Sequence, residues 1–256
     1  MKVVLLGVGL IILFITLRAP DGDAVPEANF PQQWWSIFVR FLPFGFFLLI
    51  SFFYVRRFRL MRAPMNEGVK LLGQGRYVQA LEIFEKYRQA QPNEPAGAFN
   101  SGSTKLQLWK LDAALADLES SRAMAKGKVP ALAALLPEHL ALVQALLGRV
   151  GDARESLKDL PPDQADPGRV RLAEAIVLAR HGDAAGARTK LSSFEVKQMS
   201  GTIGALARTL DAMCIEQLTG ELRHVDRVAL FGETGPDELR KAWPELISFV
   251  ERAPAW

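Results

Sequence analysis

The chain has 256 residues, which is long enough to bury a sizeable core in one or two domains. Its formal net charge is only +3, so the composition as a whole does not indicate a nucleic-acid partner. The single cysteine, Cys214, excludes an intramolecular disulfide framework, and its apolar neighbours predict a core position. The first 60 residues are crowded with Leu, Ile, Val and Phe, whereas the remainder alternates apolar and charged residues.

The first hydrophobic segment is an uncharged run over about 3–17 with basic residues on both sides. It is short for a membrane-spanning helix, which needs about 20 residues. A cleaved secretory signal peptide is the alternative, because Gly22 and Ala24 have a cleavage-like spacing. The stretch 18–23 is charged and contains a proline, which makes it a poor approach to a peptidase site. These features favour a retained transmembrane helix.

The second hydrophobic segment, about 37–55, is predicted to span a membrane. Its only charged residue, Arg40, lies near one end, where a long side chain can reach the lipid headgroups. Trp34 and Trp35 precede the segment and Tyr54 lies near its other end, as aromatic residues do at membrane interfaces.

Four arginines follow this segment directly: Arg56, Arg57, Arg59 and Arg62. The positive-inside rule predicts that they lie in the cytoplasm and that the linker before the second segment lies outside. Residues 1–62 would then form a membrane hairpin, and the C-terminal domain would be cytoplasmic whether or not the first segment is cleaved. The cluster can also attract anionic lipid, at about 1 kcal/mol per basic residue.

From residue 64 onward, a small residue is followed twelve positions later by an alanine, four times in succession. The pairs are Gly68 and Ala80, Gly102 and Ala114, Ala141 and Ala153, and Ala175 and Ala187. Four residues after the alanines come Phe84, Leu118, Leu157 and Leu191, and five residues before them come Gly75, Trp109, Gly148 and Gly182. Small residues let two helices approach closely, and glycine suits a left-handed helix end. The pattern therefore predicts helix pairs that stack into a solenoid.

Over residues 64–194 the sequence resembles the tetratricopeptide repeat family, whose period is about 34 residues. The best match is Gly68-x2-Leu71, Gly75-Arg76-Tyr77, Ala80-x3-Phe84 and Pro92, and the next is Phe99-Asn100-Ser101-Gly102 with Leu111-Asp112-Ala113-Ala114-Leu115. The family's first-helix tryptophan is absent, and Pro64, Ala98, Pro137 and Arg171 stand in its place. A five-residue excess precedes the third repeat and is placed at 126–130.

The resemblance implies that the first helix of each pair lines a concave groove that receives a peptide or helix. The implied groove residues are Met65, Val69, Phe99, Ser103, Leu106, Gln107, Glu138, Leu142, Arg169, Leu172, Ile176 and Arg180. Most are apolar, so the expected protein partner is an amphipathic helix or an apolar peptide. The family's carboxylate clamp is not expected, because only Asn100 and Lys105 are loosely comparable. In the alternative interpretation, the chain's own C-terminal helices fill the groove.

The expected fold is all-α: two transmembrane helices in 1–62, an α-solenoid of four tetratricopeptide-like helix pairs in 63–199, and a cap in 200–256. In the cap, apolar spacing predicts a helix over 203–218 that ends at Gly220. Residues 222–230 are its predicted partner in a degenerate fifth helix pair. Helix-start residues follow at 234–238, and Trp243-Pro244 predicts a further break before the last capping helix.

No enzyme, cofactor or metal site is expected. His139, His181 and His224 are scattered, without the spacing of metal ligands. The acidic residues Glu82, Glu85, Asp117 and Glu119 have the spacing of solvated helix faces.

Two functions remain open at this point. The first is a membrane-anchored scaffold or assembly factor that binds a protein partner at the cytoplasmic face, with a bacterial inner membrane as the expected location. The second is a structural or regulatory subunit of a stable integral membrane complex, whose spans pack on other membrane subunits. Membrane lipid is an expected contact in both, and nucleic acid in neither.

Overall fold

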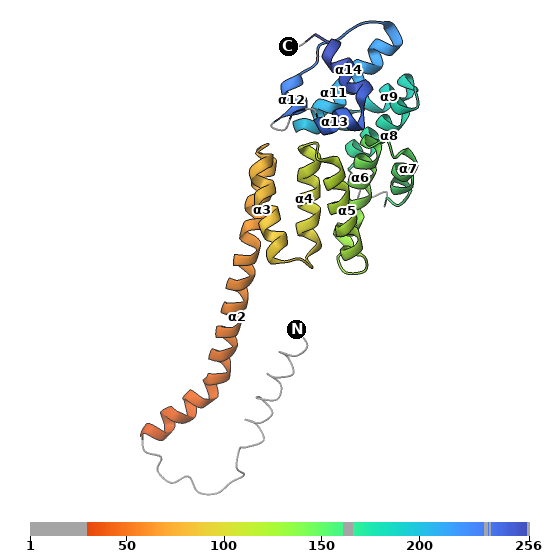
Figure 1. Ribbon diagram of the computed structural model, residues 1–256. Helices are drawn as coiled ribbons and strands as arrows, with labels where there is room; N and C mark the ends of the chain where they lie inside the picture. The colour runs from red at the N-terminus through yellow and green to blue at the C-terminus, as the bar shows by residue number, and fades with distance from the viewer. Residues whose placement is uncertain (1–29, 161–165, 233–234, 236, 255–256) are drawn as a thin grey trace. The chain divides into compact units, whose positions relative to one another are not determined.

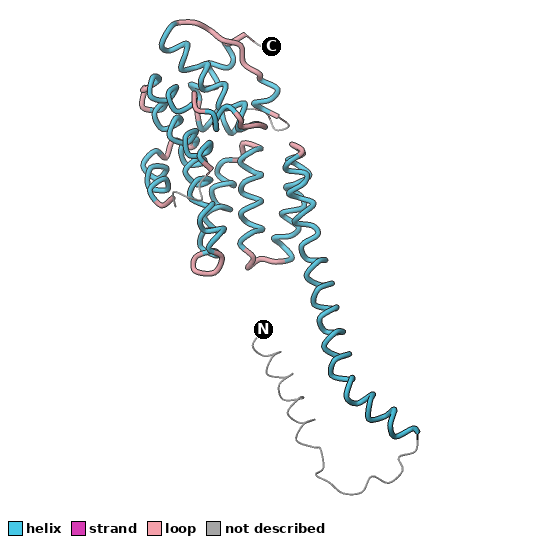
Figure 2. The backbone as a smooth tube through the Cα atoms, turned by 180° about the vertical axis from the view of Figure 1, so that it is seen from behind, coloured by secondary structure: helices cyan, strands magenta, loops and turns pink. Residues whose placement is uncertain are grey.

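The structure is a computed structural model that describes residues 30–160, 166–232, 235 and 237–254, without the side chains of 30–40, 54 and 56–62. Over these residues the regular elements are helices, apart from one isolated bridge at Val225 (Figures 1 and 2). The predicted all-α class is confirmed for this part of the chain. The chain divides into two compact units, residues 1–63 and 64–256.

The first unit contains most of helix α2 (Phe30–Gly73). Its described apolar side chains are exposed all along 41–55, from 65% at Phe41 to 38% at Ile50. In the part of the chain that the structure describes, no helix meets the length and apolarity required to cross a membrane. The predicted span over 37–55 is therefore not confirmed and stays a prediction. The predicted span over 3–17 lies outside the described residues.

The second unit begins with helices that pair in chain order. Residues 64–73 of α2 pair with α3 (Tyr77–Ala90), α4 (Pro95–Gln107) with α5 (Leu111–Ala125), α6 (Pro130–Leu146) with α7 (Val150–Lys158), and α8 (Pro167–Arg180) with α9 (Ala184–Leu191). Figure 1 shows the neighbouring pairs side by side. This is the predicted order of four helix pairs.

The register of the pairs is confirmed by burial at the predicted close contacts. Ala80, Ala114, Ala153 and Ala187 are all completely buried. A Cβ on Gly68 would overlap the Phe84 ring, and a Cβ on Gly102 would lie 2.9 Å from Leu118 Cγ. The small residue of one helix therefore makes room for the large residue of the next, as close packing requires.

All four predicted turn residues adopt the left-handed conformation. Gly75, Gly148 and Gly182 have φ of 75°, 76° and 80°, and Trp109 has φ of 56°. Trp109 is the one non-glycine residue with positive φ among the described residues. A side chain in this conformation costs roughly 1–2 kcal/mol, which glycine avoids.

Two predictions about element boundaries are wrong. The five-residue excess does not lengthen a loop: α6 has 17 residues against 13 in α4, and the segment 126–129 is no longer than 91–94. Most of the insertion is an extra helical turn, which Pro130 can begin because proline is tolerated at the first helical position. The predicted helix over 222–230 is also shorter, since α12 covers only Arg227–Phe231.

The C-terminal helices fold back onto the repeats. They are α10 (Phe194–Lys197), α11 (Gly201–Thr219), α12 (Arg227–Phe231), α13 (Asp237–Ala242) and α14 (Pro244–Arg252). As predicted, α11 ends at Gly220, which has φ of 75°, and Trp243 separates α13 from α14. Helix α11 packs on α9 and also touches α4 and α8, which are first helices of earlier pairs.

Candidate functional site

The candidate site is the face that the resemblance predicts to be concave, called the concave face from here on, and its two halves differ in exposure. Over the first two repeats, Val69 is 49% exposed, and Met65, Phe99 and Ser103 are half-buried. The amide of Asn100 lies 3.1 Å from Met65 Sδ, which joins the first helices of these two repeats. This half of the predicted groove presents apolar side chains to solvent.

The predicted groove residues of the third and fourth repeats are not open. Leu142, Leu172 and Ile176 are completely buried, and Leu106 of the second repeat is 2% exposed. They belong to one apolar cluster that also contains leucines of α11 and the apolar face of α14. The prediction that these four residues line an open groove is therefore wrong, because the chain's own C-terminal helices complete the core around them.

Two side chains of α4 and its turn hold the C-terminal helices in place. The Thr202 hydroxyl, at the start of α11, donates to the Gln107 carbonyl at 3.0 Å and also contacts the Gln107 side-chain oxygen. The Trp109 indole N–H donates to the Leu230 carbonyl of α12 at 2.6 Å. Gln107, predicted to contact a partner, contacts α11 instead.

Arg180, another predicted groove residue, links three helix ends. Its guanidinium donates to the Leu146 carbonyl at the end of α6 and, at 2.8 Å, to the Ala242 carbonyl at the end of α13. The same group lies 4.4 Å from the centroid of the Trp243 ring. Carbonyls at helix C-termini have no partner within their own helix, so a cation there is favourable. Burial lowers the pKa of Arg180 and the charge of Glu245 opposes that effect.

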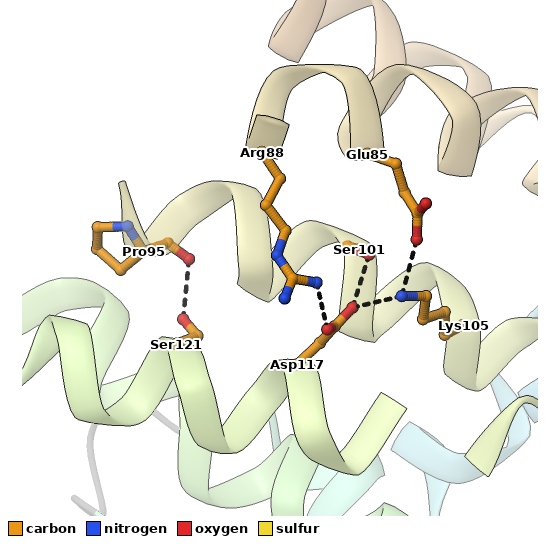
Figure 3. Close-up of polar contacts among 7 residues, drawn as sticks. All are labelled: Glu85, Arg88, Pro95, Ser101, Lys105, Asp117 and Ser121. Atoms are coloured by element: carbon orange, nitrogen blue, oxygen red, sulfur yellow. Dashed lines mark hydrogen bonds and ion pairs between the residues drawn. The ribbon is translucent and has the colours of Figure 1, made fainter. Parts of the chain in front are cut away.

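A buried ionic cluster joins the first two repeats on helices α3, α4 and α5 (Figure 3). Asp117 of α5 accepts from the Ser101 hydroxyl at 2.7 Å, from Lys105 at 2.7 Å, and from Arg88. Lys105 also pairs with Glu85 at 2.8 Å. Burial acts to lower the pKa of Lys105, but its bonds to Asp117 and Glu85 outweigh this and raise it.

This cluster corrects one prediction about the acidic residues. The sequence pattern predicts a solvated face for Asp117, but this residue is 4% exposed. The missed signal is that Ser101 and Lys105 lie one helical turn apart on α4, so both can reach one carboxylate. Lys105 has two carboxylate partners, and Asn100 donates to its own helix at the Ala96 carbonyl.

The boundary between the two halves is formed by Glu138 and His139 on α6. Glu138 is completely buried, accepts from Arg169 at 3.0 Å and accepts from the Asp166 backbone N–H. Burial raises the pKa of Glu138, and the hydrogen bonds from these two donors act to lower it by a smaller amount. The His139 ring packs edge-on against Phe99 at 4.8 Å between centroids. Glu138 and Arg169, predicted to face a partner, instead pair with each other.

Leu135 is absent from the groove residues predicted from the sequence, although the repeat register places it at a groove position. It is 36% exposed and lies 34 positions before Arg169, the corresponding residue of the next repeat. The repeat register alone could have found it. Leu135 therefore adds an exposed apolar side chain at the start of the third repeat.

The comparisons with known proteins give the chain no family. No family model matches it, and no curated protein matches it. The crystal structure of a thermophilic TPR protein from Thermus thermophilus is similar at 17% identity and a TM-score of 0.41, over 75% of this chain and 96% of that chain. The tetratricopeptide-like arrangement rests on the helix pairs, the left-handed turns and the buried small residues described above.

Proposed function

We propose that the chain is a non-enzymatic, membrane-anchored scaffold or assembly factor that binds a protein partner through its repeats. The observation that carries this proposal is that four apolar side chains on the face predicted to be concave are not fully buried: Val69 and Leu135 are exposed, and Met65 and Phe99 are partly buried. These four residues are called the strip. An apolar-faced helix is the complementary ligand, because such helices bind by laying their apolar side into a groove. The expected anchor points within the strip are Phe99, which is aromatic, and Val69, which is the most exposed.

Anchoring is supported by the first unit. Between residues 41 and 55, α2 exposes phenylalanine and leucine side chains around the whole helix, which water does not favour. We assign these side chains to the lipid of a bacterial inner membrane. The arginines at 56–62 follow on the carboxyl side, so the positive-inside rule assigns the repeats to the cytoplasm.

The anchoring proposal is tested by topology. A reporter fused after the last residue should be active only in a cytoplasmic assay, and replacing Arg56, Arg57, Arg59 and Arg62 with neutral residues should weaken that preference. The protein should also stay in the membrane fraction after alkaline extraction. Extraction of the unmodified chain into the soluble fraction would contradict anchoring and leave the repeat proposal standing.

The binding proposal is tested by site-specific photo-crosslinking in cells. A photoreactive amino acid at Val69 should capture a partner, whereas the same group at Val228, which is 85% exposed on α12, should not. Replacing Phe99 with Ala should then weaken binding of that partner roughly thirtyfold, the value for an aromatic anchor worth about 2 kcal/mol. Equal capture at both positions would exclude a specific groove.

The alternative is a subunit of a stable integral membrane complex. It is favoured by Gly45, where a Cβ would meet no atom within 4 Å, so a neighbouring helix could approach closely. The stoichiometry of the purified complex distinguishes the two functions. A fixed ratio to other membrane proteins indicates a subunit, and substoichiometric soluble partners indicate a scaffold.

A further inference from the structure

Trp109 occupies the one repeat turn at which the chain departs from glycine. The corresponding residues of the other repeats are Gly75, Gly148 and Gly182, all with positive φ. Trp109 adopts the same left-handed backbone although a side chain is disfavoured there. Its ring is 1% exposed, and its indole donates to the Leu230 carbonyl, 121 residues further along the chain. The unfavourable backbone is therefore coupled to a long-range contact.

Two neighbouring contacts involve the same part of the C-terminal segment. Thr202 bonds to Gln107, two residues before Trp109. Gly201, also with positive φ, lies so close to the Tyr77 hydroxyl that a Cβ would overlap it. Tyr77 begins α3, directly after the turn of the first repeat. The turns of repeats one and two therefore hold the start of α11 and the end of α12.

We propose that these contacts of Tyr77, Gln107 and Trp109 with residues 201–232 form a closure that controls access to the concave face of the third and fourth repeats. Leu142 and Ile176 of these repeats are completely buried and belong to the same apolar cluster as α11. A partner helix that extends along α4 beyond Ser103 meets Gln107 one turn later, where Thr202 is bound. Partner and closure then compete for α4.

The closure proposal rests on the proposed function in one respect only, which is that the molecule competing with the closure for α4 is a partner helix. The closure itself is tested without a partner, by hydrogen exchange of the full chain in detergent. The first variant is Trp109→Gly, which restores the residue of the other repeat turns and removes the indole contact. The second is Gly201→Ala, whose methyl group would collide with Tyr77. Its matched control is Gly220→Ala at the other end of α11, where φ is 75° and no atom lies within 4 Å of a Cβ.

If the closure exists, Trp109→Gly and Gly201→Ala should each speed exchange at least tenfold over 201–207, 227–231, 142–146 and 172–176. Exchange over α3 and α5 should stay unchanged, and Gly220→Ala should leave the first two of these segments near wild type. Adding Tyr77→Phe to Gly201→Ala should restore slow exchange, because the colliding hydroxyl is gone. This rescue is not expected if the alanine acts through backbone strain alone.

Cys214 gives an internal control because it is completely buried on α11. Its reaction with a thiol reagent should remain slow in both variants if only the closure opens and α11 stays on α9. Fast thiol reaction together with faster exchange throughout 64–254 would mean global destabilisation and would overturn the proposal. Unchanged exchange over the four segments would overturn it as well. Neither result bears on whether a partner binds at Val69, which the crosslinking experiment decides.

Discussion

The two halves of the concave face are built from equivalent repeat positions but have opposite environments. Val69 and Ser103 in the first two repeats correspond to Leu142 and Ile176 in the next two. The first pair is partly exposed, and the second is completely buried beneath the C-terminal helices. The repeat position therefore sets which way a side chain points, whereas the remainder of the chain decides whether that direction leads to solvent. One half stays partly exposed and the other belongs to the core.

The first two repeats are also joined by an ionic cluster that links three helices. Replacing Asp117 with Ala removes the shared partner of Arg88, Lys105 and the Ser101 hydroxyl, and leaves Lys105 with Glu85 as its remaining carboxylate. Breaking a buried ion pair on one side costs about 3–5 kcal/mol when the remaining charge has no compensation. Here Arg88 is 39% exposed and Lys105 keeps Glu85, so the free energy of unfolding should fall by about 3 kcal/mol, the lower end of that range.

Urea unfolding followed by far-UV circular dichroism measures this effect. The matched control is Glu119→Ala, an exposed carboxylate on the same helix, which should change stability by less than about 0.5 kcal/mol. Equal losses for the two variants would show that the cluster contributes no more than a surface charge.

The difference between the two halves is tested most directly by the same kind of substitution at equivalent repeat positions. Replacing Leu142 with Ala should lower the free energy of unfolding by about 2–5 kcal/mol, because it opens a cavity in a closed core. Replacing Val69 with Ala should cost less than about 0.5 kcal/mol, because that side chain is half in water already. Thermal unfolding of both variants under the same conditions gives the difference. Similar losses would mean that the two halves are not distinct.

Much of this arrangement follows from local sequence rules. The spacing of Gly68, Gly102 and their alanine partners predicts the register because close helix contacts need small residues wherever they occur. The turn residues are predictable for a similar reason, since the left-handed conformation favours glycine. Residues 130–133 are harder to place, because an insertion that starts with proline is compatible with either a loop or an extra helical turn.

The occupied half of the groove could not be predicted from the repeat pattern. The pattern places Leu172 on a concave face, but only the path of the chain after residue 200 determines that α11 returns to that face. Trp109 could have been recognised in the sequence as a contact residue. A tryptophan at a turn otherwise made by glycine is unfavourable unless its side chain makes a compensating contact. Its partner, the Leu230 carbonyl, is a backbone group, and backbone groups have no sequence signature.

The smallest predicted effect concerns His139, at the border of the two halves. Burial and the nearby Arg169 lower the pKa of His139 to about 3, from about 6.5 in an unfolded chain. The neutral His139 ring donates through Nδ1 to the Leu135 carbonyl at 3.0 Å. Glu138 Oε1 lies 3.5 Å from His139 Nδ1. The unfolded chain therefore binds a proton between pH 6.5 and 3 that the folded chain does not bind.

Stability from His139 should be fully present above about pH 6.5 and should fall by up to ~1.4 kcal/mol per pH unit as the pH drops toward about 3. Glu138 opposes part of this loss, because its raised pKa makes the folded chain bind a proton first. Urea unfolding of wild type and His139→Gln at about pH 7 and about pH 5 measures the difference, with His181→Gln, at an exposed helix end, as the control. The wild type should lose more stability between these pH values than His139→Gln and about as much as the control. If His139→Gln loses as much stability between these pH values as the wild type, the acid sensitivity comes from other groups. His139 would then not be the titrating residue at the border of the two halves.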